Sequence, residues 1–265
     1  LVPATVIAEQ PVAVIWEIQN QGTSVTNASW TDSIYLSEDD AAGDDLRLGV
    51  VQSSGTLLTE ESRRFTNQVI FPAGKSGARF LAVAANSSGS VFEGMNYGNN
   101  TNIAEAAFTI QAADLVVDSV VIEPATGLFG GEFEVTFTVR NQGTAAAVLP
   151  WETRVLVLHE PNNFSSATLL LHEPAAAVLN PGATDTRTVG VTIPVKEGAA
   201  EGSYQIAVVA DGYDDVGEGV ETNNARFASV TLTLPPMPDL AVTGIQAPTD
   251  ALPNSSFALS WTTTN

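Results

Sequence analysis

The sequence predicts an all-β protein built from repeated antiparallel sandwiches, and three observations support that prediction. Asn20-Gln21-Gly22 followed by Trp30 recurs as Asn141-Gln142-Gly143 followed by Trp151, so one constant shift superimposes both features. Apolar residues alternate along the stretch before each tripeptide, which is typical of a half-buried strand. Such short stretches, separated by turn residues, recur about seven times per copy, and helical periodicity is not seen.

Residues 1–112 are the first predicted domain, and they start without the strand that opens the later copies. That strand is predicted at 114–117 and 239–242, where the pattern Asp-Leu-x-Val precedes the key asparagine. Its counterpart in the first copy would lie before Leu1. We therefore expect an unpaired neighbouring edge in this copy, and unpaired edges favour self-association.

The strands that follow the tripeptide correspond in both copies. Val155 and Val157 follow Trp151 on the same parity, and the first copy repeats this pattern after Trp30. A tryptophan that shares the parity of aliphatic neighbours is more typical of a core side chain than of a ligand platform. We therefore interpret both tryptophans as structural.

Each copy ends with a polar loop and a last strand. The loops, 86–100 and 211–224, carry Glu93 and Glu218 and close with paired asparagines. Asparagine tolerates left-handed turn geometry, so the pairs fit hairpin corners. The last strands are predicted at 103–110 and 227–234.

Residues 113–235 are the second predicted domain, and residues 236–265 are the incomplete start of a third copy, in which Trp261 aligns with Phe137. Two strands are too few to bury a face alone. The link at 111–113 is short and the link at 235–238 is rich in proline. Both kinds of link restrict hinge motion, so a semi-rigid rod is expected.

Composition limits the partners. The chain has 30 acidic and 10 basic residues, a net charge of −20, so it repels phosphate backbones and anionic membranes. Because of this charge we expect that the segment does not bind nucleic acid. We also expect no membrane contact by this segment, because no apolar run is long enough to span a membrane. Cysteine is absent, which excludes disulfides and thiolate chemistry.

The shared residues resemble the CARDB family, the cell-adhesion-related domain of bacterial and archaeal surface proteins. The resemblance rests on the Asp-Leu-x-Val opening, the Asn-Gln-Gly turn, the segments 30–32 and 34–37, and the closing 218–224. It implies immunoglobulin-like sandwiches in tandem arrays, in an extracellular or cell-surface location. The second copy departs from the pattern, since Thr153 stands where the first copy has Asp32.

The motifs of common catalytic sites are missing. The two histidines, His159 and His172, lie in the second copy alone, and neither a nucleophile elbow nor a phosphate-binding loop is present. We therefore predict no enzyme, but a non-catalytic structural or adhesion repeat that forms a semi-rigid stalk. Its partners are further repeats of the same polypeptide and an unknown protein or carbohydrate surface ligand. The alternative is an accessory binding module of a secreted polysaccharide- or protein-degrading enzyme.

Calcium is the one ion that the acidic loops suggest. The loop from Glu38 to Asp45 does not match the EF-hand spacing, but the chain direction brings it to the same junction as the loop from Asp211 to Glu221. Carboxylate oxygens are the hard ligands that calcium takes. Each loop could instead hold an ion alone or stay solvated. The candidate calcium ligands are Asp39, Asp40, Asp44, Asp45, Asp114, Asp214, Asp215 and Glu218.

Overall fold

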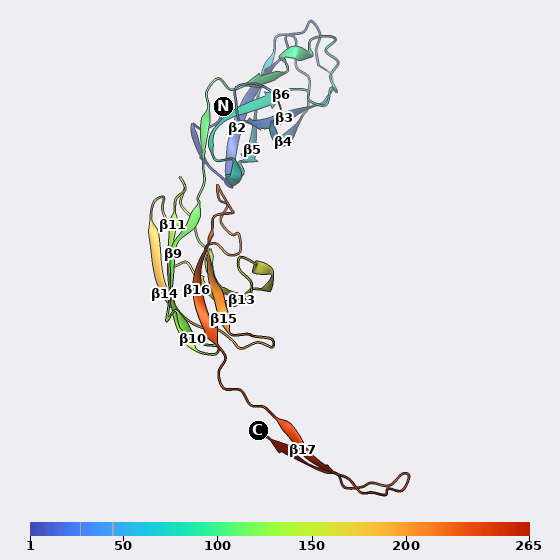
Figure 1. Cartoon of the computed structure of the whole chain (residues 1–265). Coiled ribbons are helices and arrows are strands. Elements are labelled where there is room, and N and C mark those ends of the chain that lie inside the picture. The colour runs from blue at the N-terminus through green and yellow to red at the C-terminus, as the bar shows by residue number, and fades with distance from the viewer. Residues whose placement is uncertain (27, 44) are drawn as a thin grey trace.

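The structure is a computed structural model, and it describes residues 1–26, 28–43 and 45–265 (Figure 1). The elements of the described residues are strands and three short 3-10 helices, η1 (Ala73–Lys75), η2 (Tyr97–Asn99) and η3 (Phe164–Ser166). The strands form two sandwiches and a separate hairpin, so the predicted all-β, immunoglobulin-like class is confirmed. In these residues no helix is long and apolar enough to span a membrane.

The first sandwich packs a two-stranded sheet, β2-β5, against a larger sheet in the order β1-β8-β6-β3-β4, with β7 also paired to β6. Alternation along β2 turns Val14 and Trp16 inward, and the next strand buries Ile34 and Leu36. Its strands are β1 (Thr5–Ile7), β2 (Pro11–Gln19), β3 (Trp30–Ser37), β4 (Leu46–Ser53), β5 (Ser62–Ile70), β6 (Gly77–Ala84), β7 (Thr101–Ile103) and β8 (Phe108–Gln111).

The second sandwich packs the sheet β14-β11-β9 against the sheet β10-β16-β15-β12-β13. The expected count of about seven strands is too low here, because the first predicted strand divides at Pro124. Its first part pairs with β11, and its second part crosses to the other sheet and pairs with β16. The strands are β9 (Leu115–Glu123), β10 (Thr126–Leu128), β11 (Glu132–Asn141), β12 (Glu152–Leu158), β13 (Thr168–Pro174), β14 (Thr184–Thr192), β15 (Gly202–Val209) and β16 (Ala225–Thr233).

Each sandwich has its own apolar core. Trp30 and Trp151 are 3% and 2% exposed, as the interpretation of these residues as structural requires. Phe137 packs with Trp151 in the core of the second sandwich, and Trp16 holds the corresponding place in the first. The repeated pattern therefore specifies the two cores separately.

The first core contains a buried acid, Asp32, and the second core has a different residue at the corresponding position. Asp32 is fully buried, and it accepts hydrogen bonds from Ser53 Oγ (2.9 Å), Trp16 Nε1 (3.3 Å) and the amide of Asn86 (3.2 Å). Burial raises the pKa of this carboxyl above its ordinary value, although the hydrogen bonds oppose the shift. Thr153 takes its place in the second sandwich. These donors give Asp32 a structural role.

Residues 236–265 contain a two-stranded hairpin, β17 (Ala241–Gln246) and β18 (Ser260–Thr264). Every residue of both strands is exposed, and Trp261, which aligns with the buried Phe137, is 63% exposed. Two strands cannot cover a face, as the sequence indicated.

Replacing Trp151 with alanine tests this account of the core. The change removes a buried ring, so Trp151→Ala is expected to cost about 3 to 5 kcal/mol in the second sandwich. Hydrogen exchange should then show lost protection in β9 to β16 and retained protection in β2 to β6. Trp261→Ala is the control and should change stability very little. Equal loss of protection in both sandwiches would contradict separate cores.

Candidate functional site at the domain junction

The link between the sandwiches is buried rather than exposed. Ala112 and Ala113, which connect β8 to β9, are 4% and 3% exposed. The carbonyl of Ala112 accepts hydrogen bonds from the amides of Thr144 (2.8 Å) and Ala145 (2.9 Å). The second sandwich therefore binds the chain that enters it.

Asn141, the first residue of the repeated tripeptide, organises this contact. Its side chain is fully buried, and its Nδ2 donates to the carbonyls of Ala145 and Leu179, both at 2.8 Å. Its Oδ1 accepts from the amides of Gly143 (3.0 Å) and Asp114 (3.2 Å). Sequence reasoning recognised the turn and missed the contact with the linker.

Gly143 is required because the linker crosses directly over it. A Cβ atom at this position would lie 2.5 Å from Ala112 O, from the carbonyl carbon of Ala113 and from Asp114 N. Such distances are far below van der Waals contact, and backbone atoms cannot move aside easily. The corresponding Gly22 has only the side chain of Asn20 within 3.1 Å, so the first sandwich lacks this crossing among the described residues.

Glu218 closes the other side of the linker. It is 1% exposed, its Oε1 accepts from the amide of Leu115 (3.0 Å), and its Oε2 accepts from Asn224 Nδ2 (2.6 Å). The next amide, that of Gly219, donates to the carbonyl of Ala113 (2.8 Å). Burial raises the pKa of Glu218 to about 8, so the carboxyl is largely protonated at neutral pH.

Two further acids lie in the same loop and also hold protons more tightly than usual. Asp211 is buried, and it accepts from the amides of Asp215 (3.1 Å) and Val216 (2.8 Å), which fixes the turn. Glu221 accepts from the amide of Glu218 (2.9 Å). Burial raises the pKa of both carboxyls, and neighbouring acids raise it further.

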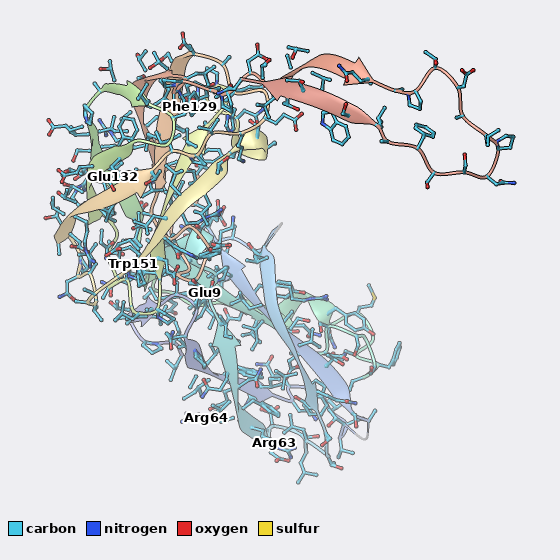
Figure 2. The ribbon with its side chains drawn as sticks, turned by 90° about the horizontal axis from the view of Figure 1, so that it is seen from below. Glu9, Arg63, Arg64, Phe129, Glu132 and Trp151 are labelled. Atoms are coloured by element: carbon cyan, nitrogen blue, oxygen red, sulfur yellow. The ribbon has the colours of Figure 1, made fainter. Side chains whose placement is uncertain are left out.

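The loop also touches the first sandwich through its glycines. A Cβ at Gly217 would lie 2.5 Å from Glu9 Cγ, and one at Gly219 would lie 3.1 Å from Ser76 Oγ. Glu9 is held in place because its Oε1 accepts from the amide of Ala73 (3.0 Å). Figure 2 shows Glu9 where the two sandwiches meet.

The acidic loop of the first sandwich has basic neighbours. Glu38 forms a 2.9 Å ion pair with Lys75, and this hydrogen bond lowers the pKa of Glu38. Asp39 and Asp45 line an open pocket of about 660 Å³, whose wall also contains Lys75 and Arg79. These two cations oppose the binding of calcium in the pocket.

The candidate calcium ligands are only partly brought together. Asp214, Asp215 and Glu218 share one loop, and Asp114 is joined to it because Asn223 Nδ2 donates to its Oδ1 (2.9 Å). Within the described ranges, no group of three or more His, Asp or Glu side chains has the arrangement of a metal site. Asp40 is exposed on the other loop, and Asp44 lies outside the described residues. Calcium binding stays a prediction.

The raised pKa of Glu218 predicts how stability depends on pH. The unfolded chain releases this proton near the ordinary value of 4.5, whereas the folded chain keeps it up to about 8. The folded state binds more protons between these values, so the free energy of unfolding should fall as pH rises through this window. The slope contributed by one proton is about 1.4 kcal/mol per pH unit.

Glu218→Gln should remove that contribution, because glutamine does not titrate and Asn224 can turn its amide to meet it. Asp211 and Glu221 shift in the same direction and leave a residual slope. Urea unfolding of both proteins at several pH values measures the difference. Identical slopes for the two proteins would show that Glu218 titrates normally.

Comparison with known proteins shows which family part of this chain is similar to. Residues 112–228 match the CARDB family model. A search of curated proteins found no match. A solved CARDB domain from Pyrococcus furiosus, described in complex with di-metal ions, is 24% identical with a TM-score of 0.35, covering 48% of this chain and 99% of that one.

Two other solved structures are similar to part of the chain. A domain of a cell surface protein from Methanosarcina acetivorans is 23% identical with a TM-score of 0.33, covering 46% of this chain and 93% of that one. A β-glucosidase from Erythrobacter marinus is 14% identical with a TM-score of 0.32, covering 46% of this chain and 16% of that one. The CARDB family match therefore covers the second sandwich, from the linker at Ala112 into β16.

Proposed function

We propose that this chain is a non-catalytic structural or adhesion segment, part of a semi-rigid stalk in a large cell-surface or secreted protein. The enclosed linker is the observation that carries the proposal. A spacer must hold its domains at a fixed angle, and a linker with buried, hydrogen-bonded backbone has little freedom to bend. The surface location is taken from the setting of CARDB domains.

The contacts at the first junction support a fixed angle from two directions. The tripeptide 141–143 holds the linker on one side, and Glu218 with Gly219 holds it on the other. Bending at Ala113 would separate these groups and leave buried donors and acceptors without partners. Each such group costs about 1 to 3 kcal/mol, so bending is strongly disfavoured.

The second link has a different basis for stiffness. Residues 236–238 are exposed, and prolines restrict the backbone of this link directly. Proline-rich segments act as semi-rigid spacers. We therefore expect a more variable angle after residue 235 than at the first junction.

The alternative of an accessory module in a degrading enzyme calls for a carbohydrate or protein ligand on one face. A row of exposed aromatic rings would favour it, since such rings present a flat apolar surface to a ligand. The exposed aromatic residues of the described chain are spread over several parts of it, with Phe92 and Tyr97 in loop 86–100, Phe164 on η3, Tyr213 in loop 211–224, and Phe257 and Trp261 in the C-terminal segment. The spacer therefore remains the better supported function.

Distance measurements between the sandwiches test the fixed angle. The chain has no cysteine, so Val50→Cys and Val121→Cys, which are 52% and 51% exposed, provide one spin label in each sandwich. Double electron–electron resonance should give one narrow distance distribution. Gly143→Ala should broaden it, because the added methyl displaces the linker backbone. Gly22→Ala is the matched control and should leave it narrow. A broad distribution in the parent protein would refute the stalk.

Calcium at the first junction is a separate proposal, tested with the same labels. If an ion joins the acidic loops, millimolar calcium should narrow the distribution further and raise the melting temperature of the first sandwich. Asp39→Asn with Asp45→Asn should abolish both effects, and magnesium serves as the control ion. An unchanged distribution and melting temperature in calcium would exclude the ion while leaving the fixed junction intact.

A further inference from the structure

Three side chains of the second sandwich converge on one histidine nitrogen. Nδ1 of His172, in β13, lies 3.1 Å from the hydroxyl oxygen of Tyr213 and 3.3 Å from Oε2 of Glu152. Glu152 begins β12, and Tyr213 belongs to loop 211–224. The three groups therefore come from three separate segments of the chain, and none of them is among the candidate calcium ligands.

The register of β12 and β13 brings the carboxylate and the imidazole together. Thr153 and Val155 point into the core and are buried, so Glu152 and Arg154 face outward. Arg154 lies opposite His172 in the antiparallel pair, which makes Glu152 and His172 diagonal neighbours on the outer face. Diagonal neighbours lie within reach of long side chains. The sheet therefore places two of the three groups.

Loop 211–224 is bound to β12 at the residue before Tyr213. The amide of Gly212 donates to the carbonyl of Glu152 (2.9 Å), and Nη1 of Arg154 donates to the carbonyl of Gly212 (3.0 Å). A Cβ at Gly212 would overlap the side chain of Arg154, so glycine lets the loop approach this closely. The backbone thus brings the tyrosine to the other two groups.

Hydrogen bonds alone do not serve all three groups. An uncharged imidazole nitrogen either donates a proton or accepts one. If Nδ1 of His172 accepts the hydroxyl proton of Tyr213, its lone pair faces the carboxylate of Glu152 with no proton between them. If Nδ1 donates to Glu152 instead, it no longer accepts from Tyr213. A cation among the three atoms interacts favourably with each of them.

The separations of these atoms match a transition-metal centre. Zinc lies about 2.1 Å from nitrogen and oxygen ligands, so two ligands at a tetrahedral angle are about 3.4 Å apart. Nδ1 of His172 is 3.1 and 3.3 Å from its two neighbours, which is close to this value. Imidazole is a ligand of zinc and copper, whereas calcium takes oxygen ligands. This group therefore differs in chemistry from the acidic loops.

The nearby charges are mixed. Arg154 opposes a cation, but its guanidinium is held by the carbonyl of Gly212 and lies 5.1 Å from the centre of the Tyr213 ring. Asp214 and Asp215 follow the tyrosine in the same loop and favour a cation. The three carboxylates, counting that of Glu152, outweigh the one guanidinium.

The first sandwich has other side chains at the corresponding positions, which are Thr31, Val50 and Ser88. The first two follow from the strand registers, and the third from the left-handed residues Asn86 and Asp211 that open the equivalent loops. Val50 has no donor atom in its side chain. The group is therefore a local feature of the second sandwich, and the first sandwich is an internal control.

We propose that Glu152, His172 and Tyr213 bind a divalent transition-metal ion, copper or zinc. On binding, the hydroxyl of Tyr213 gives its proton to water and its oxygen bonds to the metal, while Nδ1 of His172 binds as a neutral nitrogen. Water completes the coordination, because the side chains of His172 and Glu152 are 53% and 33% exposed. The ion joins loop 211–224 to β12 and β13, and this site does not depend on the proposed stalk function.

Titration of the complete chain with Cu²⁺ tests the proposal, because copper binds most tightly among the divalent ions of the first transition row. The parent protein should show a visible charge-transfer band from tyrosinate to copper and an electron paramagnetic resonance coupling to an imidazole nitrogen. Tyr213→Phe removes only the oxygen and should abolish the band, and His172→Gln should abolish the coupling. Each should weaken binding by about tenfold or more, since even the loss of a residue that only supports a ligand has such an effect.

Tyr204→Phe and His159→Gln are the matched controls, and both should leave the band and the affinity unchanged. The site variants should fold, because Tyr213 is 50% exposed and His172 lies on the outer face of the sheet. Zinc should compete with copper and raise the melting temperature of the second sandwich in the parent protein but not in His172→Gln.

A parent protein that binds neither ion would overturn the proposal. Binding that survives both Tyr213→Phe and His172→Gln would also overturn it, and would assign the ion to the N-terminal amine or to the acidic loops. Binding that is lost in His172→Gln but unchanged in Tyr213→Phe would refute the site of three ligands.

Discussion

The junction between the two sandwiches depends on the passage of one backbone over another at Gly143. A methyl group at this position would overlap three backbone atoms of the linker, so the crossing exists only because the side chain is a hydrogen atom. Once the linker lies there, Asn141 and Thr144 on one side and Glu218 on the other reach it with hydrogen bonds. The angle between the sandwiches therefore follows from a steric condition inside the second one.

Because the second sandwich encloses the linker, its folding also determines its position relative to the first sandwich. Asn141 uses both amide hydrogens and its carbonyl oxygen in the closed arrangement, and three of its partners, Gly143, Ala145 and Leu179, belong to its own sandwich. Its bond to Asp114 and the bond of Glu218 to Leu115 exist only while β9 is in place. Burial raises the pKa of Glu218 to about 8 and neighbouring acids add to the shift, although the two hydrogen-bond donors oppose it, so the carboxyl is largely protonated at neutral pH.

The fold could be predicted from the sequence because the constant shift between the copies aligns core positions such as Trp30 and Trp151. The alternation of apolar residues alone assigns these side chains to the interior. The site could not be predicted, because Gly22 and Gly143 lie in identical tripeptides. They differ in that the linker backbone passes over Gly143. The division of the first strand at Pro124 also went unseen, since alternation continues on both sides of it. The calcium ligands were chosen by charge and chain direction, which do not reveal that Lys75 pairs with Glu38.

Comparing the two copies position by position shows that contacting residues change together. In the first core Trp16, Asp32 and Ser53 form one hydrogen-bonded set, and the second core has Phe137, Thr153 and Ala175 in these places, so the indole of Trp16 and the acid that accepts from it are both replaced. A change at one member alone would leave a buried polar group without a partner, which is costly. The same reasoning applies to the ends of the sandwiches, where size replaces polarity. At the observed junction Glu9 fills the space that a side chain at Gly217 would need, so a difference between the copies is informative at the surface as well as in the core.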